Sequence, residues 1–274
     1  MRILITGHKG FIGQNIMSYL ETKHEVAGYD FHPENLPLVK DYDWVIHLGA
    51  ISSTTETDVD KVILHNYEFS KWLFNQCNQY NVNMQYASSA SVYGNTTHFK
   101  EDGPSDPKSP YAWSKYLFDR WVTGIHPKII FQGFRYFNVY GPHEEHKGNQ
   151  ASPITKFTKQ AQEEGEITIF TDSENYKRDF ICVSDICKIH EKMFDIKEKG
   201  IYNIGTGKAV SFKQVADLIA KKYNAKIKYI PMPENLKHQY QSYTCANLEK
   251  LNTCLLYTSP SPRDSCASRM PSSA

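Results

Sequence analysis

Short apolar runs alternate with longer amphipathic stretches through the first half of the chain, and no other feature restricts the fold as strongly. The runs are rich in Ile and Val and too short for helices, so they indicate strands. An order in which each strand is followed by a helix is typical of a parallel sheet covered on both faces. We therefore predict an α/β fold with a doubly wound parallel sheet. The expected strands are residues 2–5, 26–29, 44–48, 84–87 and 129–134, and the expected helices are residues 12–20, 62–80 and 111–122.

The second half of the chain is less regular and predicts a smaller α/β domain. It contains helix candidates at residues 153–164 and 212–223 and a strand candidate at residues 180–183. Residues 254–274 change to Ser, Pro and Arg without apolar periodicity, which indicates a disordered tail. Because no helix stop signal precedes this change, we interpret the tail as foreign to the native protein.

Charge and composition exclude several classes of partner. Lys and Arg total 31 against 30 Asp and Glu, a net charge of +1, so no overall field attracts nucleic acid or an anionic membrane. Apolar runs of about 18 residues, the length of a membrane helix, are absent. The chain starts without a signal-peptide pattern, and its 6 Cys residues form no regular framework, as expected for reduced thiols. We expect a soluble, cytoplasmic protein.

A glycine-rich segment, residues 6–13, links the first expected strand to the first expected helix. A dinucleotide-binding loop requires this position, because the helix N-terminus offers free N–H groups to phosphates. Gly7 permits a tight turn, Gly10 lets a pyrophosphate approach the backbone, and Gly13 allows the helix to pack closely on the strand. A glycine turn without a ligand is the alternative. The candidate cofactor-binding residues of this loop are Gly7, Lys9, Gly10, Phe11, Ile12 and Gly13.

Asp30 and Lys9 favour different nicotinamide cofactors. Asp30 ends the second expected strand, where a carboxylate can accept hydrogen bonds from the ribose hydroxyls of NAD. Lys9 lies in the glycine loop, where a cation suits the 2′-phosphate of NADP, which Asp30 would repel. The residues by themselves leave the choice between NAD and NADP open.

A Tyr and a Lys four residues apart form the candidate catalytic pair. Tyr111 and Lys115 lie on one face of an expected helix, where the ammonium can lower the pKa of the phenol and hold a ribose. The phenol can then act as acid and base near neutral pH. A surface pair is the alternative for this common spacing. Ser88 and Ser89 follow the expected strand 84–87, at the edge of a parallel sheet where ligands bind.

Three segments together resemble the extended short-chain dehydrogenase/reductases. They are the glycine loop, the Ser-Ser-Ala-Ser-Val-Tyr-Gly segment at residues 88–94 and the Tyr-x-x-x-Lys helix. The resemblance implies a Rossmann domain, a nucleotide-activated sugar as substrate, and a role for Ser89 as hydrogen-bond partner of the reacting hydroxyl, with Ser88 as the alternative. Family members that dehydrate sugars carry an Asp-Glu pair next to this serine. This chain has Ala90 and Ser91 there, which argues against dehydration.

Longer segments resemble the ADP-glycero-manno-heptose 6-epimerases within this group. They are residues 52–56, 66–67, 134–148, 173–180 and 202–207, and the His-Lys-Gly at residues 146–148 is the most diagnostic. The resemblance implies epimerisation at C6 of an ADP-activated manno-heptose, from the D-glycero to the L-glycero form, through a transient 6-keto intermediate. Together with Lys9 it outweighs Asp30, so we predict NADP as the cofactor, with NAD as the alternative.

The same resemblance assigns roles to further residues. It implies that Lys147 is a second acid/base, since hydride must leave one face of the carbon and return to the other. A phosphate contact or a solvated loop residue is the alternative for Lys147. The remaining substrate-binding candidates are Asn138 and Arg178 at the diphosphate and Ser53 and Thr54 at the sugar, each with a turn, an ion pair or a helix cap as its structural alternative.

These inferences define the expected organisation and partners. We assign residues 1–138 and 184–205 to a dinucleotide-binding Rossmann domain and residues 139–183 and 206–253 to a substrate domain. The segment 30–44 is too short for the additional edge strand and helix of the family. Residues 143–146 lack the spacing of a zinc motif, so we predict no metal site. We expect a nucleotide-sugar substrate and a protein able to form homo-oligomers. The alternatives are another nucleotide-sugar epimerase or reductase, such as a UDP-hexose 4-epimerase, and a non-catalytic dinucleotide-binding protein.

Overall fold

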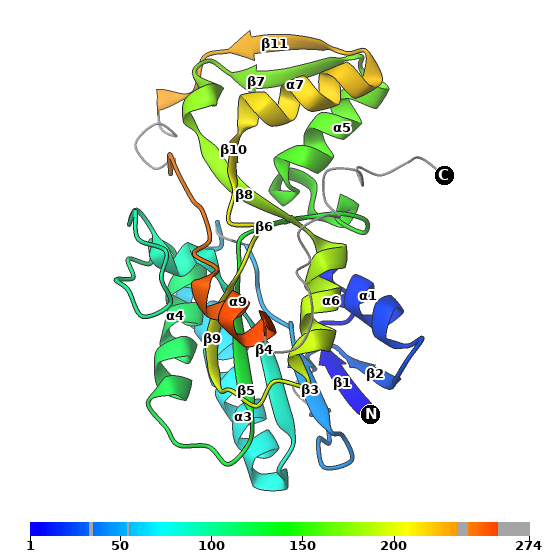
Figure 1. The fold of residues 1–274 in the computed structure, drawn as a ribbon, viewed down its shortest axis with the longest axis vertical. Coiled ribbons are helices and arrows are strands. Elements are labelled where there is room, and N and C mark those ends of the chain that lie inside the picture. Colours follow the sequence, from blue (N-terminus) through cyan, green and yellow to red (C-terminus); the bar gives the residue numbers. More distant parts are fainter. Residues whose placement is uncertain (33–34, 54, 235–240, 257–274) are drawn as a thin grey trace.

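The computed structural model describes residues 1–32, 35–53, 55–234 and 241–256, which form a larger and a smaller domain (Figure 1). The larger domain contains a parallel sheet in the order β2-β1-β3-β4-β5-β9. The order reverses between β1 and β3, so the predicted doubly wound α/β fold is confirmed. Its strands are β1 (Arg2–Thr6), β2 (Glu25–Tyr29), β3 (Trp44–His47), β4 (Asn83–Ser89), β5 (Phe131–Tyr136) and β9 (Gly200–Ile204).

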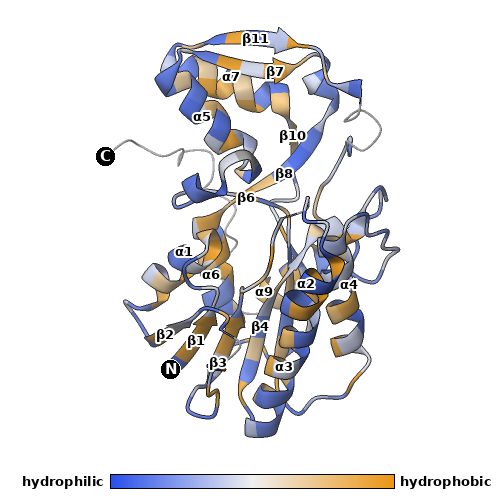
Figure 2. Ribbon diagram, turned by 180° about the vertical axis from the view of Figure 1, so that it is seen from behind, coloured by the Kyte–Doolittle hydropathy of each residue, from blue (hydrophilic) through white to orange (hydrophobic). Residues whose placement is uncertain are grey.

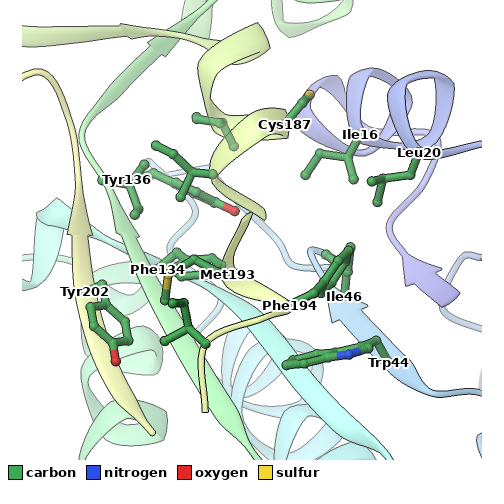
Figure 3. Close-up of a cluster of buried hydrophobic side chains, with 14 of the residues drawn as sticks. Ile16, Leu20, Trp44, Ile46, Phe134, Tyr136, Cys187, Met193, Phe194 and Tyr202 are labelled. Carbon is green, nitrogen blue, oxygen red and sulfur yellow. The ribbon is translucent and has the colours of Figure 1, made fainter. Parts of the chain in front are cut away.

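Helices cover both faces of this sheet. On one face, α1 (Phe11–Leu20) and α6 (Val183–Met193) pack through apolar side chains such as Ile16 and Met193 (Figure 3). On the other face, α3 (Phe69–Tyr80) and α4 (Pro110–Thr123) pack through Leu73 and Phe118. Strands β1 and β3 are hydrophobic along most of their length (Figure 2), as a sheet buried on both faces requires.

The smaller domain contains two short sheets and two helices. Strands β10 (Ala209–Ser211), β8 (Lys177–Cys182) and β6 (Asn138–Tyr140) form one sheet, and β11 (Lys226–Ile230) pairs with β7 (Glu166–Phe170) in the other. Helices α5 (Pro153–Glu163) and α7 (Phe212–Tyr223) pack together through a separate apolar cluster that includes Ile154, Ile167 and Val215. Helices α5 and α7 match the sequence predictions, whereas β6, β7, β9, β10, β11 and α6 were not predicted.

The helix expected over residues 62–80 is interrupted by a π-helical turn. Helix α2 (Val59–Val62) runs into η1 (Ile63–Glu68), which leads into α3. The side chain of Asn66 in this turn accepts a hydrogen bond from the backbone N–H of Ile51 at 2.8 Å and donates to the hydroxyl of Ser114 at 3.1 Å. The turn therefore ties the loop after β3 to helix α4. Turns of this kind are frequent at functional sites.

The C-terminal part of the described chain differs from the sequence prediction. Helix α9 (Glu249–Leu256) packs on β9, and its Leu251 and Leu255 are buried in the core of the larger domain. These residues were assigned to the substrate domain and the tail, but their apolar side chains cover the sheet instead. Residues 257–274 lie outside the described residues. Between β2 and β3 the described residues form no strand, so β2 is the edge of the sheet, as the short connection predicts.

Candidate active site

A cavity of about 840 Å³ lies at the carboxyl ends of the strands of the large sheet. Its lining includes Gly7 after β1, Leu48 after β3, Ser89 at the end of β4 and Tyr136 at the end of β5. The opposite wall comes from residues 144–153, which lead into α5 of the smaller domain. In open α/β sheets, ligands bind in the crevice where the strand order reverses, and this cavity lies at that reversal.

The glycine loop forms one wall of the cavity and has no room for side chains at two positions. Gly7 has a φ of +73°, and a Cβ atom there would lie 2.6 Å from the backbone N of Gly49 in the loop after β3. A Cβ atom on Gly13 would overlap the carbonyl oxygen of Gly7. Helix α1, which follows Gly10, has no side-chain cap, so its first N–H groups remain available to a phosphate. Gly7, Gly10, Phe11, Ile12 and Gly13 all line the cavity and fit a dinucleotide.

Asp30 and Lys9, which bear on the choice of cofactor, are placed differently. Asp30 follows β2 and lines the cavity. Lys9 does not line it, and its side chain is 77% exposed. The ammonium of Lys9 lies 3.3 Å from the carboxylate of Asp30. The loop therefore presents the carboxylate of Asp30 to the cavity, with the ammonium of Lys9 paired to it on the exposed side.

Ser89, Tyr111 and Lys115 lie together on the cavity wall. The side chain of Ser109 caps helix α4, which places Tyr111 in the first turn and Lys115 one turn later. A hydrogen bond joins the side chains of Tyr111 and Ser89. The Nζ of Lys115 lies 5.9 Å from the centre of the Tyr111 ring. The three predicted catalytic residues thus converge from two separate elements.

Burial perturbs the proton affinities of this pair. Lys115 is 5% exposed, and desolvation lowers its pKa to about 8, with the carboxylate of Asp119 acting in the opposite direction. Desolvation raises the pKa of Tyr111, while its hydrogen bond with Ser89 lowers it. Perturbed titratable groups that share a cleft are typical of catalytic sites.

Lys147 lies across the cavity in η3 (Glu145–Gln150), near the glycine loop. Its ammonium is 5.1 Å from the centre of the Phe11 ring, and desolvation lowers its pKa. Glu144 anchors this segment, because its buried carboxylate accepts hydrogen bonds from the backbone N–H and hydroxyl of Ser152 and from the hydroxyl of Thr155. Ser152 is the N-cap of α5, so Glu144 holds the cap residue and fixes the start of the segment that carries Lys147.

The substrate-binding candidates are only partly brought to the cavity. Asn138 lines it and donates a hydrogen bond to the carbonyl oxygen of Asp179 at 3.3 Å. Ser53 does not line it, and its hydroxyl instead accepts a hydrogen bond from the Gln150 side chain at 2.7 Å. Thr54 lies outside the described residues.

Arg178 also does not line the cavity. Its guanidinium donates to the carbonyl oxygen of Lys177 at 2.9 Å and lies 5.4 Å from the centre of the Phe212 ring. The neighbouring Asp179 is fully buried, and its carboxylate accepts hydrogen bonds from the backbone N–H groups of the loop 206–207 and of residue 246. Asp179 therefore holds together the chain segments that meet between the two domains.

The cavity also has lining residues that the sequence analysis did not identify. Tyr136 ends β5, and its hydroxyl forms a 2.5 Å hydrogen bond with the imidazole of the buried His190. The lining residues come together only when the chain folds. The one sequence feature that pointed to any of them was the cluster of acidic residues and histidines at residues 143–146. Among the described residues, no three His, Cys, Asp or Glu side chains gather as a metal site. The unpredicted lining residues include Phe31, His65, Tyr136, Glu144, Gln150 and Ser152.

The fold and the glycine-lined cavity are those of a dinucleotide-binding protein, and a family model agrees. The chain belongs to the NAD dependent epimerase/dehydratase family, whose model matches residues 3–205. None of the helices in the part of the chain that the structure describes is long and apolar enough to span a membrane.

Solved structures of nucleotide-sugar enzymes are similar to this chain. The ADP-L-glycero-D-manno-heptose-6-epimerase of Helicobacter pylori is 28% identical, with a TM-score of 0.83 and coverage of 94% of this chain and 90% of that chain. The UDP-N-acetylglucosamine 4-epimerase of Methanobrevibacter ruminantium is 24% identical, with a TM-score of 0.86 and coverage of 96% and 93%. The UDP-glucose 4-epimerase of Thermus thermophilus, solved with NAD, is 25% identical, with a TM-score of 0.73 and coverage of 92% of both chains.

Proposed function

We propose that this protein is a nucleotide-sugar epimerase that inverts C6 of ADP-D-glycero-manno-heptose to the L-glycero form through a transient 6-keto intermediate. The observation that carries the proposal is the presence of Ser89, Tyr111, Lys115 and Lys147 around one cavity that the glycine loop also lines. The similarity to a heptose epimerase at 28% identity supports the choice of substrate.

The residues suit an oxidation followed by a reduction at one carbon. Tyr111, as phenolate, takes the proton of the substrate hydroxyl, while Ser89 holds that hydroxyl by a hydrogen bond. Lys115 is positively charged at neutral pH and stabilises the phenolate. A bound nicotinamide supplies the acceptor for the hydride that leaves the carbon and later returns to it.

Inversion requires that the ketone expose its second face before reduction. The new alcohol then points toward a different part of the cavity and needs a proton there. Lys147 lies in the wall contributed by residues 144–153, where the carboxylate of Glu144 partly offsets the effect of burial on its ammonium. Desolvation lowers its pKa, which eases proton donation, so we assign the second proton transfer to Lys147.

The carboxylates of the cavity argue against dehydration. Of the described lining residues, Asp30 and Glu144 carry carboxylates. Glu144 is engaged at the start of α5, and Asp30 lies at the glycine loop. Neither is next to Ser89, where a dehydrating member of the family carries its Asp-Glu pair.

The placement of Asp30 supports NAD rather than the NADP predicted from the sequence. A carboxylate at the end of β2 accepts hydrogen bonds from ribose hydroxyls and repels a 2′-phosphate. Lys9, which favoured NADP, is paired with Asp30 outside the cavity lining. We therefore propose NAD as the preferred cofactor, and a comparison of the dissociation constants of NADH and NADPH by fluorescence tests it.

The substrate proposal is tested by incubating the protein and NAD with ADP-D-glycero-manno-heptose and following the configuration of C6 by NMR. We expect appearance of the L-glycero epimer. Parallel incubations with UDP-glucose and UDP-N-acetylglucosamine provide the comparison, because UDP-sugar 4-epimerases share the fold. Turnover of a UDP-sugar without inversion of the heptose would refute the substrate assignment. Cofactor binding without turnover of any of the three nucleotide sugars would refute the proposal that the protein is an epimerase.

A further inference from the structure

Helix α4 carries a third ionisable residue, Asp119, on the same face as Tyr111 and Lys115. Asp119 lies one turn beyond Lys115 and two turns beyond Tyr111, so the three residues share one face of the helix. Asp119 is fully buried. A carboxylate at such a site requires charged or hydrogen-bonding partners, because removing a charge from water is costly.

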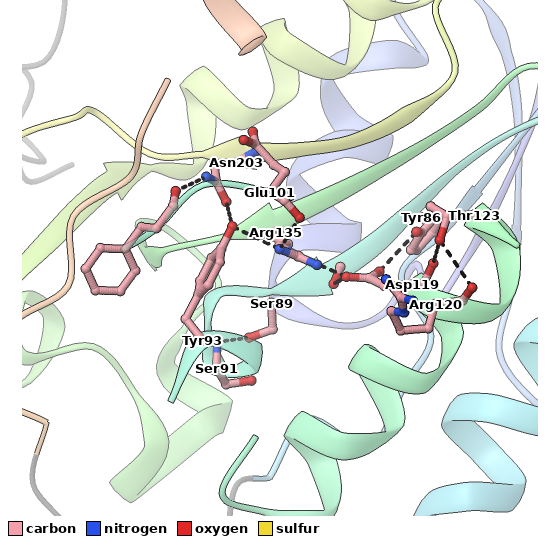
Figure 4. A network of polar contacts seen from close by, with 12 residues as sticks. Tyr86, Ser89, Ser91, Tyr93, Glu101, Asp119, Arg120, Thr123, Arg135 and Asn203 are labelled. Carbon is pink, nitrogen blue, oxygen red and sulfur yellow. Dashed lines mark hydrogen bonds and ion pairs between the residues drawn. The ribbon is translucent and has the colours of Figure 1, made fainter. Parts of the chain in front are cut away.

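Two strands supply these partners (Figure 4). The Nε of Arg135 donates to Oδ2 of Asp119 at 2.9 Å, and the hydroxyl of Ser88 donates to the same oxygen at 2.9 Å. The hydroxyl of Tyr86 donates to Oδ1 at 3.0 Å. Ser88 and Arg135 are direct neighbours in the register of β4 and β5. One carboxylate therefore ties helix α4 to the ends of two strands.

The contact through Ser88 lies one residue away from the catalytic serine. Ser88 is buried, and its hydroxyl proton is engaged by Asp119. The adjacent Ser89 forms a hydrogen bond with Tyr111 instead. Strand β4 and helix α4 are thus joined at two successive residues, first by a charge-assisted bond in the interior and then by a neutral bond at the cavity.

We propose that Asp119 is a positioning residue that acts through Ser88 to hold the hydroxyls of Ser89 and Tyr111 in register for proton transfer. The proposal rests on the proposed function, in which these two hydroxyls act on the substrate. The proposal gives the adjacent serines different roles, since Ser88 binds a buried carboxylate and Ser89 binds the substrate hydroxyl. The ionisable groups around the carboxylate are Arg135 on β5, Tyr86 on β4 and Lys115 on α4 itself.

Two matched variants test this role without removing the buried charge. Substitution of Asp119 would leave Arg135 unpaired and endanger folding. Ser88→Ala and Tyr86→Phe each remove one hydroxyl donor from the same carboxylate, but only Ser88 is adjacent to the catalytic serine. For Ser88→Ala we expect kcat to fall by about 10-fold or more, with KM and the dissociation constant of NAD changed by less than about 2-fold. Tyr86→Phe should lower Tm comparably and change kcat by less than about 2-fold.

Crystal structures of the two variants provide a readout that does not depend on turnover. The distance between the hydroxyl oxygens of Ser89 and Tyr111 should increase in Ser88→Ala and stay unchanged in Tyr86→Phe. An unchanged distance in Ser88→Ala, or equal losses of kcat in both variants, would overturn the positioning role. Absence of epimerisation by the wild-type protein would refute the proposed function instead, while the two structures would still decide whether Asp119 sets this distance.

Discussion

Two buried imidazoles should make the protein sensitive to mild acid. His47 accepts a hydrogen bond from Thr6 and donates to Ser70, and His190 is held between Gln85 and Tyr136. Desolvation lowers the pKa of each to about 3 in the folded state. An unfolded chain has a histidine pKa of about 6.5, so it binds more protons than the folded protein between these values. The stability present above pH 6.5 is therefore lost as the pH falls toward 3.

The loss in free energy of unfolding at pH 5 follows from the titration of the unfolded state alone. At this pH the folded imidazoles remain neutral and the unfolded ones are almost fully protonated. A difference of about 1.5 pH units corresponds to about 2 kcal/mol for each imidazole, hence about 4 kcal/mol for the pair. A domain protein is stable by about 5–15 kcal/mol in total, so the loss should be a large part of the free energy of unfolding.

Urea unfolding at pH 7 and pH 5, at equal ionic strength, measures this difference through far-UV circular dichroism. His190→Gln retains a neutral hydrogen-bonding side chain and should reduce the pH-dependent loss to about 2 kcal/mol. The variant is expected to be less stable than the wild type at pH 7, which does not affect the comparison. A wild-type loss below about 1 kcal/mol, or an unchanged loss in His190→Gln, would refute the reasoning.

Three predictions concern catalysis and the cofactor. Tyr111→Phe should lower kcat by about 10²- to 10⁴-fold and retain NAD binding, measured by kinetics and by cofactor fluorescence. Lys147→Met should block inversion but leave the first oxidation by Tyr111, so that absorbance at 340 nm rises without the L-glycero product; normal inversion would exclude Lys147 as the second acid. Asp30→Ala should improve binding of NADPH relative to NADH by about 10-fold or more, because it removes the negative charge beside a 2′-phosphate. An unchanged ratio of dissociation constants would contradict the role of Asp30.

The sequence predicts the elements whose side chains follow a regular apolar pattern. The bounds expected for α7 match the structure, because Phe212, Val215 and Ile219 recur at helical spacing and are buried together. Strand β11 was not predicted, although the segment Lys226–Ile230 alternates Lys with apolar residues, because this segment is only 5 residues long and largely exposed. Its partner β7 is about 60 residues away along the chain, and no local signal announces such a pairing.

The candidate site was predictable where motifs stand next to strand ends. The glycine loop, Ser89 and the Tyr111–Lys115 helix all follow strands that the sequence predicts, and they line one cavity. The role predicted for Lys9 stays a prediction, because sequence position does not reveal which way a loop side chain points, and its exposed ammonium pairs with Asp30. Arg178 illustrates the same difficulty, since its guanidinium contacts the Phe212 ring rather than the cavity lining.

The chain leaves the large sheet after β5, returns to it for α6 and β9 and enters the smaller domain again, and its described part ends on α9 against β9. Neither domain is therefore a continuous piece of chain, and no single cut by a protease would release one that could fold alone. Assembly must bring together segments far apart in sequence, which slows folding. We expect the two domains to unfold in one transition, so that loss of the smaller domain would also dismantle the cofactor site.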